Sequence, residues 1–387
     1  MGCSGETGMN KDNYIIAEIE IRDFEEESTI QIISSYDYLI RNVPDERREE
    51  ENDDDLLNEK EIKDCVISID GKIIPFDYHY KFGKQGKYTI KYTFNHLLTK
   101  TDYMFCYCNN LRKIDLTHLN TEKVTNMSFM FHRLIDVEVI DVSKLNTKNV
   151  KDMMNMFFYC EKVTELDVSK FDTKNVINMS NMFSNCSKLT KLNVSKFDTR
   201  NVQTMSGMFY SCSSLTELNL SKWNTKEVIN FGGLFCSCYS LKKIDVSSFN
   251  TENAIIMESM FSDCRELTNI NVSNFNTKNV ENISEMFYNT AIESLDLSNF
   301  NTEKVTNMID LFKKCQNLKK LNISNFKANS ADLDKMFYKC SSLEKKNIIT
   351  KDEKILAQFD KDLVAKDDEE EEEGEEGECE GEGGEGY

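Results

Sequence analysis

A column of acidic or amide side chains recurs along the chain and is the first candidate for chemistry. Asp115, Asp141 and Asp167 are followed at regular intervals by Asn or Asp as far as Asn322. Paired carboxylates can perform acid–base catalysis or hold calcium. The glycine-rich nonapeptides of calcium-binding β-helices do not occur in the sequence, and a Ser or Thr follows each residue two positions later. We therefore expect a solvated polar ladder rather than an ion site.

Cysteine supplies the second candidate chemistry, because most of the thirteen cysteines occupy one position of a repeat. The column consists of Cys108, Cys160, Cys186, Cys212, Cys238, Cys264, Cys315 and Cys340. Leu134 and Thr290 replace it in two units, which indicates a small slot that a free thiol fills well. Neighbours about 5 Å apart could form disulfides, but a reducing cytosol would keep them as thiols. The Cys-x-Cys pairs at Cys106 and Cys236 lie too far apart to share zinc, so we predict no metal or other cofactor.

The first residues resemble a lipid-modification signal. Gly2 followed by Cys3 is the arrangement used for myristate on the glycine and palmitate on the cysteine, but Glu6 stands where that motif has Ser or Thr. The alternative is an unmodified, disordered start. The sequence holds no apolar run of about 18 residues and no apolar stretch of signal-peptide length. We expect a cytoplasmic protein that reaches a membrane only through acylation; the alternative location is the cell surface.

The formal net charge of -20 is concentrated in two segments. Residues 45–64 hold eleven acids and four bases, and residues 367–387 hold thirteen acids and no base. The remainder is near neutral, so no basic surface is expected. Binding to nucleic acid or to anionic lipid through such a surface is therefore disfavoured.

A strict internal repeat determines the expected architecture. A Met-Phe or Leu-Phe pair recurs at a spacing of 26 residues seven times and of 25 residues twice. The phenylalanines of these pairs are Phe105, Phe131, Phe157, Phe183, Phe209, Phe235, Phe261, Phe287, Phe312 and Phe337. Periods of this size are typical of solenoids and propellers, and one short strand per unit argues against a four-stranded propeller blade.

The apolar spacing within a unit predicts its local structure. Leu192 and Val194 alternate with polar residues, as in a half-buried strand. Val176, Met179 and Met182 are three apart, which suits a short α- or 3₁₀-helix that begins at an N-cap near Thr173. We predict an α/β repeat solenoid, a right-handed leucine-rich-repeat-like arrangement in which the strands form one long parallel sheet.

These residues carry a family resemblance. The recurring pattern Phe-[Asn/Asp]-Thr-x-x-Val-x-x-Met-x-x-Met-Phe-x-x-Cys-x-x-Leu resembles the BspA-type leucine-rich repeats of bacterial and protist surface proteins, and the repeats of some mycoplasma lipoproteins. The resemblance covers about 240 residues in nine to ten units. It implies an adhesin or interaction scaffold with no common catalytic residue.

The repeat defines the expected domain boundaries. Residues 101–349 form the solenoid, and residues 1–13 form a flexible start. Residues 14–100 form a small, mostly antiparallel β module, which acts as a cap on the repeats or as a separate binding domain. It is interrupted by the acidic loop 44–64. Helical spacing in residues 350–366 predicts a capping helix, and the Glu/Gly-rich tail 367–387 is disordered by composition.

Recognition is expected where the constant repeat leaves positions free to vary. One exposed column precedes the inward strand residue, and a second column of aromatic residues follows the buried Phe. The candidate interaction residues are Lys113, Glu165, Lys191, Glu217, Lys243, Lys320, Tyr210, Tyr288 and Tyr338. We predict a non-enzymatic, monomeric scaffold for an unidentified protein partner; the alternative is a cell-surface adhesin of the BspA type.

Overall fold

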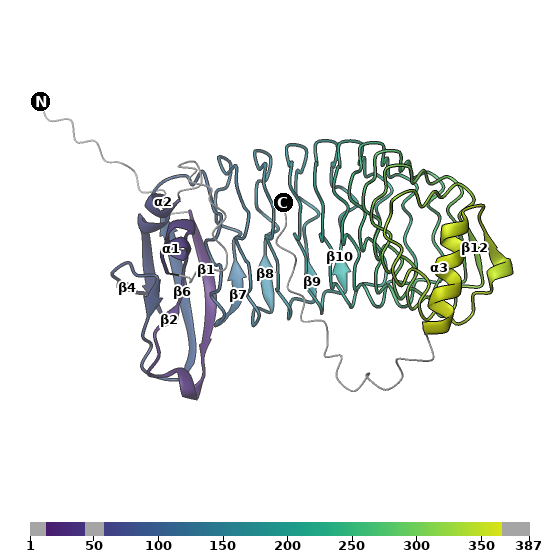
Figure 1. Ribbon diagram of the computed structural model, residues 1–387. Helices are drawn as coiled ribbons and strands as arrows, with labels where there is room; N and C mark the ends of the chain where they lie inside the picture. Colours follow the sequence, from purple (N-terminus) through teal and green to yellow (C-terminus); the bar gives the residue numbers. More distant parts are fainter. Residues whose placement is uncertain (1–12, 43–57, 366–387) are drawn as a thin grey trace, which may run out of the picture.

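The computed structural model describes residues 13–42 and 58–365 of the chain. The acylation candidates Gly2 and Cys3, most of the acidic loop and the tail 367–387 lie outside these residues. Figure 1 shows the N-terminal module at one end of a row of coils, and the C-terminal helix at the other end.

The N-terminal module is built from short strands and two short helices. Its elements are β1 (Tyr14–Ile21), η1 (Asp23–Glu25), β2 (Ile30–Gln31), α1 (Tyr36–Asn42), α2 (Glu59–Lys63), β3 (Cys65–Ile69), β4 (Lys72–Ile74), β5 (His79–Tyr80) and β6 (Gly86–Phe94). β3 and β4 form the hairpin about Asp70 and Gly71, whose positive φ angles of 47° and 80° suit a two-residue turn.

One sheet joins this module to the repeats. Its strand order is β4-β3-β6-β1-β7-β8, in which β7 (Leu111–Asp115) and β8 (Val139–Asp141) belong to the first repeat units. β1 pairs antiparallel with both β6 and β7. Alternate residues of β1 are buried, as the period of two predicts. The module therefore covers the first strand of the repeats.

The structure contradicts the predicted fold class. Only 9 % of the chain is helical and 18 % is strand, and no α-helix is assigned between residues 64 and 352 of the described chain. The predicted single parallel sheet is absent. The later strands, in separate sheets of two and three, are β9 (Glu165–Leu166), β10 (Lys191–Leu192), β11 (Ser294–Asp296), β12 (Lys320–Asn322) and β13 (Ile348–Ile349).

Tight turns take the place of the expected helices. The N–H of Met156 donates to the carbonyl of Met153 at 3.3 Å, and that of Cys160 donates to the carbonyl of Phe157 at 3.2 Å. Asn155 has φ +54°, as the third residue of a type II turn requires. Two successive turns of this kind place apolar residues three and four apart. They therefore imitate a helical stripe in the sequence.

These turns leave alternate backbone groups free to bond to the next unit. The N–H of Asn155 donates to the carbonyl of Ser180, and that of Phe157 donates to the carbonyl of Met182, both at 2.9 Å. Single parallel bridges also join equivalent residues, from Lys100 and Asn126 to Asn307 and Asp332. We call this side, residues 152–160 and their equivalents, the turn side. The opposite side, residues 165–168 and their equivalents, is the strand side.

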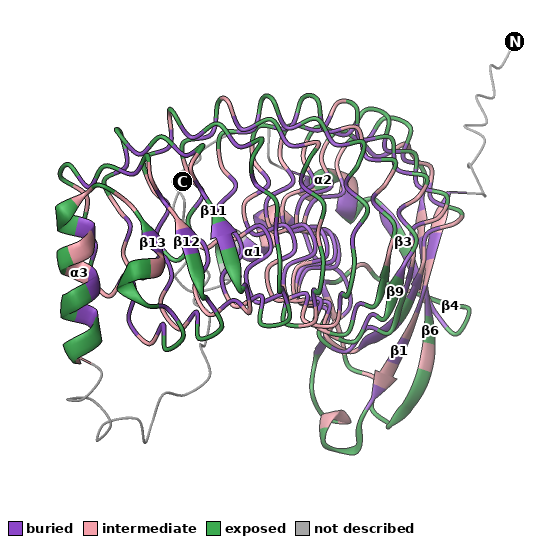
Figure 2. Ribbon diagram, turned by 90° about the vertical axis from the view of Figure 1, so that its right-hand side faces the viewer, coloured by how far each residue is buried: buried purple, intermediate pink, exposed green. Residues whose placement is uncertain are grey.

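The core consists of repeated side chains that the sequence predicted to be inward. Met179, Met182, Phe183 and Cys186 are all at most 1 % exposed. Figure 2 shows buried and exposed residues alternating along the coils. The turn-side phenylalanines from Phe105 to Phe337 lie with neighbouring ring centroids 5.4–6.1 Å apart. No single unit could bury these rings alone, so the units must lie against one another.

Both ends of the turn-side ladder are closed by complementary groups. On this side the N–H groups of each unit donate to carbonyls of the next unit toward the C-terminal end. The carbonyls of the first unit therefore receive no hydrogen bond from a preceding repeat unit. These accept hydrogen bonds from the N-terminal module: Asp102 O from Asn58 Nδ2 at 2.6 Å, Met104 O from Ser34 N at 2.8 Å, and Cys106 O from Gln31 Nε2 at 3.0 Å. At the other end, the carboxylate of Asp362 in α3 (Glu353–Val364) accepts from the N–H of Phe337 at 2.9 Å.

Candidate interaction surface

The strand side carries the exposed column that was predicted to vary. Lys113, Glu165, Lys191, Glu217, Lys243 and Lys320 are all exposed, at equivalent positions of their units. The residue that follows each in the chain is buried, as at Leu166 and Leu218, or half-buried, as at Leu192 and Ile244. The short alternating pattern of the sequence therefore places these six side chains at the surface, where a partner could reach them.

The strand side opens in the middle of the molecule. β9 pairs with β10 in parallel, through Glu165 with Lys191 and Leu166 with Leu192. From residue 193 to residue 293 no strand is assigned, although this whole stretch is described. Leu192 is consequently half-buried, whereas Leu166 is 4 % exposed.

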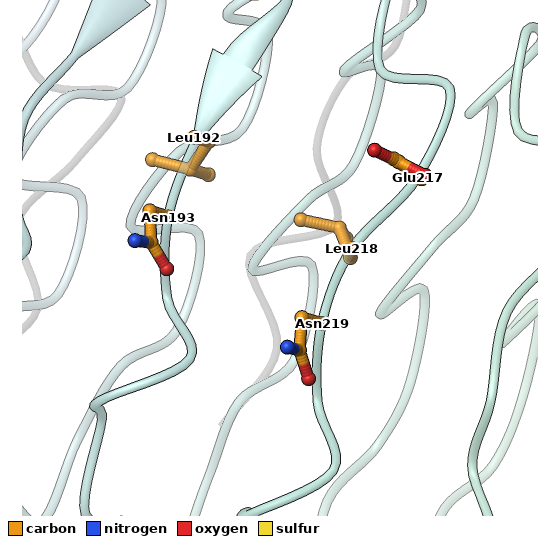
Figure 3. Close-up of a pocket in the computed structure, with 5 residues that line it drawn as sticks. All are labelled: Leu192, Asn193, Glu217, Leu218 and Asn219. Atoms are coloured by element: carbon orange, nitrogen blue, oxygen red, sulfur yellow. The ribbon is translucent and has the colours of Figure 1, made fainter.

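Two hollows lie at the opened part of the strand side. The first, of about 320 Å³, is lined by Leu192 and Asn193 of one coil and by Glu217, Leu218 and Asn219 of the next. Figure 3 shows the two sets of side chains on adjacent coils. A larger hollow of about 720 Å³ lies between residues 268–273 and 293–299. Both hollows are lined largely by polar side chains.

Side chains bridge the coils where the strand-side backbone bonds are missing. Trp223 Nε1 donates to Val194 O at 3.2 Å, Ser248 Oγ donates to Leu220 O at 2.9 Å, and Asn274 Nδ2 donates to Val246 O at 3.0 Å. The aromatic column that starts at Trp223 has neighbouring centroids 6.2–6.5 Å apart, which is wider than on the turn side. The coils are thus closer together on the turn side.

The Asp/Asn column beside the predicted interface has a structural role. The Oδ1 atom of Asn193 accepts from both the N–H and the hydroxyl of Ser195, at 3.1 and 2.7 Å. Ser169 makes the equivalent contacts, and these hydrogen bonds hold the pKa of Asp167 below its usual value. The Asp and Asn side chains of this column stabilise a turn in each unit, as side-chain caps of Asx type.

Ion pairing along the exposed column is uneven. Lys113 pairs with Glu18 of β1 at 3.1 Å, and Lys191 pairs with Glu165 of the neighbouring coil. Within residues 13–42 and 58–365 no ion pair is found for Glu217, Lys243 or Lys320. The opened middle of the strand side therefore presents unpaired charges of both signs.

The predicted aromatic column is not uniformly accessible. Tyr210 and Tyr288 are half-buried, and Tyr288 is flanked by Lys313 and Lys314 at 5.7 and 5.6 Å from its ring centroid. Tyr338 is only 5 % exposed, so the expectation that it lies at the surface is wrong. Lys335 and Lys339 lie over its ring, 5.7 and 5.4 Å from the centroid. Tyr210, Tyr288 and Tyr338 lie on the turn side and do not join the strand-side residues.

The cysteines of the column are buried in the described residues, and those from Cys108 to Cys315 are free thiols. The thiol of Cys186 donates to the carbonyl of Phe157 in the preceding unit at 3.1 Å. Cys212 and Cys238 make the same contact one unit further on each time. Burial raises the pKa of Cys186 to about 12, so the thiol stays protonated and can donate. Cysteine is therefore suited to this slot by hydrogen bonding as well as by size.

A group of exposed basic residues at the edge of the strand side was missed from the sequence. It lies where each coil turns away from the strand side, on four consecutive units. We call it the basic stripe: Lys144, Lys148, Lys170, Lys174, Lys196, Arg200, Lys222 and Lys226. The sequence does contain a repeated Ser-Lys-x-x-Thr-[Lys/Arg] pattern at these residues. The net charge outside the two acidic segments is near zero, however, and this sum does not reveal a local group of basic residues.

Neither a metal centre nor a membrane span emerges from the described part of the chain. Among residues 13–42 and 58–365 no group of three or more His, Cys, Asp or Glu side chains is placed to hold a metal ion. The helices of this part are too short or too polar to cross a bilayer.

Comparison with known proteins gives one family. The family described as "Mycoplasma protein of unknown function, DUF285" matches three overlapping segments, residues 99–192, 185–295 and 257–359. The matches cover the repeat region and most of the chain. No curated protein matches the sequence, and no BspA-type leucine-rich-repeat family is among the matches. The chain belongs to the DUF285 family of Mycoplasma-type repeat proteins.

Proposed function

We propose that the protein is a non-enzymatic interaction module that binds a protein partner along its strand side. The observation that carries the proposal is the contrast between an apolar interior that varies little and an exposed column that varies in charge. Positions such as Met179 and Phe183 hardly change from unit to unit, whereas the exposed column alternates among Lys, Glu, Val, Asn and Ser. Charges of both signs around two polar hollows can be matched by a complementary partner surface.

The open middle of the strand side is the best candidate for the centre of the interface. Glu217 and Lys243 are exposed there without an ion-pair partner among the described residues. Their charges are available to a partner without first breaking an internal contact. Lys113 and Lys191, by comparison, already pair with Glu18 and Glu165.

Affinity capture with two matched variants tests the proposal. The strand-side variant carries Glu165→Ala, Lys191→Ala, Glu217→Ala and Lys243→Ala. The control carries the same number of changes at exposed positions directly before the turn side: Thr125→Ala, Lys151→Ala, Gln203→Ala and Glu281→Ala. We expect the partner of the unmodified chain to bind the control equally and the strand-side variant at least about tenfold more weakly, a loss of about 1.4 kcal/mol. Equal binding to both variants would contradict the proposal.

A cell-surface adhesin is the second candidate, favoured by the resemblance of the repeats to BspA-type proteins. We place the protein in the cytoplasm as a monomer, with acylation of Gly2 and Cys3 as its route to a membrane. Support comes from the free thiols of the cysteine column from Cys108 to Cys315, since oxidising compartments favour disulfides. Protease treatment of intact cells separates the two: degradation before lysis would favour the adhesin, and protection would favour the cytoplasmic module.

A further inference from the structure

The basic stripe is an ordered array on a rigid edge. The hydroxyl of the buried Thr173 donates to the carbonyl of Asp198 in the next unit at 3.1 Å and accepts from the N–H of the same residue at 2.7 Å. Thr147 and Thr199 repeat this pair of bonds on either side. These bonds fix the spacing between units at about that of paired strands, ~4.8 Å. The basic side chains that flank the threonines are therefore aligned in two parallel columns.

The stripe carries a strong local positive charge. Its eight basic residues are accompanied by only two acids in the same segments, Asp172 and Asp198. Arg200 pairs with Asp198 at 2.7 Å, whereas its seven lysines have no ion pair within residues 13–42 and 58–365. Glu122 and Glu252 occupy the equivalent positions before and after the stripe. The charge is thus confined to four units.

We propose that the basic stripe binds the acidic C-terminal segment of the same chain, residues 367–387. That segment holds thirteen acids and no base, and an extended polyanion suits two aligned columns of cations. The complementarity is specific to this part of the molecule. In the C-terminal half, the positions equivalent to Lys144 and its relatives are Ser248, Asn274, Asn299 and Asn325.

The segment is long enough to reach the stripe. α3 lies against the last repeat unit, since Asp362 bonds to Phe337. About five unit spacings separate Lys222 from α3, or roughly 24 Å at ~4.8 Å each. The residues after α3 span up to about 70 Å when extended. Attachment to the same chain also gives the segment an effective concentration of about millimolar, an advantage that a free polyanion lacks.

Zero-length cross-linking of the full chain with a carbodiimide tests the proposal. The reagent joins a lysine to a carboxylate that contacts it, and mass spectrometry identifies the peptides. At about 10 mM salt we expect residues 367–387 to be linked mainly to the lysines of the stripe. At about 1 M salt, where the Debye length is ~3 Å, these links should fall at least about tenfold. Links mainly to Lys278 or Lys304, which lie nearer α3 along the repeats, would show mere proximity and overturn the proposal.

A matched pair of variants tests whether the positive charge of the stripe attracts the segment. Links are measured at lysines that are not substituted, so a smaller number of links cannot result from the removal of the reacting lysines. In Lys148→Gln/Lys174→Gln/Lys222→Gln, we expect links to the unchanged Lys170 and Lys196 to fall several-fold. In the control Lys278→Gln/Lys304→Gln/Lys320→Gln they should be unchanged. An equal mixture of ¹⁴N- and ¹⁵N-labelled chains identifies links between copies. Mixed-label links as the main product, unchanged links in the stripe variant, or no links at all would each overturn the assignment to the same chain.

Discussion

The turn side and the strand side of the repeats are built from the same units but are joined differently. On the turn side, parallel bridges connect every unit from Lys100 to Asp332. On the strand side, pairing stops after Leu192 and resumes at Ser294. Aromatic centroids are 5.4–6.1 Å apart in the turn-side column and 6.2–6.5 Å apart in the column from Trp223.

This difference separates the side that holds the units together from the side that we propose for recognition. The turn side buries the Phe, Met and Cys side chains and bonds most of its backbone to the next unit, so its sequence is constrained. The strand side makes few backbone bonds in its middle, and its exposed column can change without loss of packing. We therefore expect substitutions of buried turn-side residues to lower the free energy of unfolding strongly. Substitutions in the exposed column of the strand side should hardly change it.

Removal of a turn-side ring should have the largest effect. Phe209 is fully buried between Phe183 and Phe235, each 5.8 Å away between centroids. Phe209→Ala should lower the free energy of unfolding by about 3–5 kcal/mol, measured by urea denaturation. Leu192→Ala, at a half-buried strand-side position, should cost clearly less. Equal losses in the two variants would remove the distinction between the sides.

A buried carboxylate in the first coil should make stability depend on pH. Asp102 is 1 % exposed, neither of its carboxylate oxygens has a hydrogen-bond partner among the described residues, and burial raises its pKa to about 7. The unfolded carboxyl ionises above its ordinary pKa of 3.8, while the folded carboxyl stays protonated to about pH 7. The resulting penalty therefore grows between pH 4 and 7 and is constant above.

Asp102→Asn should remove this pH dependence. We expect the variant to be more stable than the unmodified protein by about 2–4 kcal/mol at pH 8, since each pKa unit corresponds to about 1.4 kcal/mol. The advantage should shrink toward pH 4. Urea denaturation over this pH range measures it. A constant difference at all pH values would show that Asp102 is ionised in the folded protein.

The buried threonines should come next in size. Thr199 is 1 % exposed, and its hydroxyl donates to the carbonyl of Asn224 and accepts from its N–H, at 2.9 and 2.8 Å. Thr199→Val keeps the shape but removes both bonds, so we expect a loss of about 1–3 kcal/mol. Thr190 makes a similar bond between coils on the strand side, to the carbonyl of Thr164, but it is exposed. Thr190→Val should cost less than about 0.5 kcal/mol; a larger loss there would argue for a strand side that holds the units together.

The smallest effect is expected for an exposed ion pair. The side chains of Lys191 and Glu165 are 71 % and 60 % exposed. The double variant Lys191→Ala/Glu165→Ala should change the free energy of unfolding by less than about 0.5 kcal/mol. Thermal unfolding at low and high salt checks this. A change above about 1 kcal/mol would mean that the column stabilises the fold and is not free to vary.

The repeat period and the inward positions could be read from the sequence, but the backbone conformation could not. Two turns that place Met153, Met156 and Phe157 inward give the same apolar spacing as a helical stripe. A clue was available at the positive-φ positions, which are often Asn, Asp or Gly, as at Asn181 and Gly207. Residues such as Tyr103 and Arg133 adopt the same conformation, so the clue was incomplete.

The candidate surface was predicted in part. The exposure of Lys113, Glu165 and their equivalents followed from alternation along a short strand. The opening of the strand side did not, because it depends on the spacing between neighbouring coils and not on the residues of one coil. Likewise, the basic stripe became apparent only when residues 26 positions apart were found side by side.

Amide hydrogen exchange measures the contrast between the two sides most directly. The N–H groups of Asn181 and Phe183 donate to the next unit at 2.8 and 3.0 Å, whereas no backbone acceptor is found in the described residues for those of Glu217 and Leu218. We predict that the turn-side amides exchange at least about a hundredfold more slowly than the strand-side amides of residues 217–219 and 243–245. Equal protection on the two sides would contradict the account.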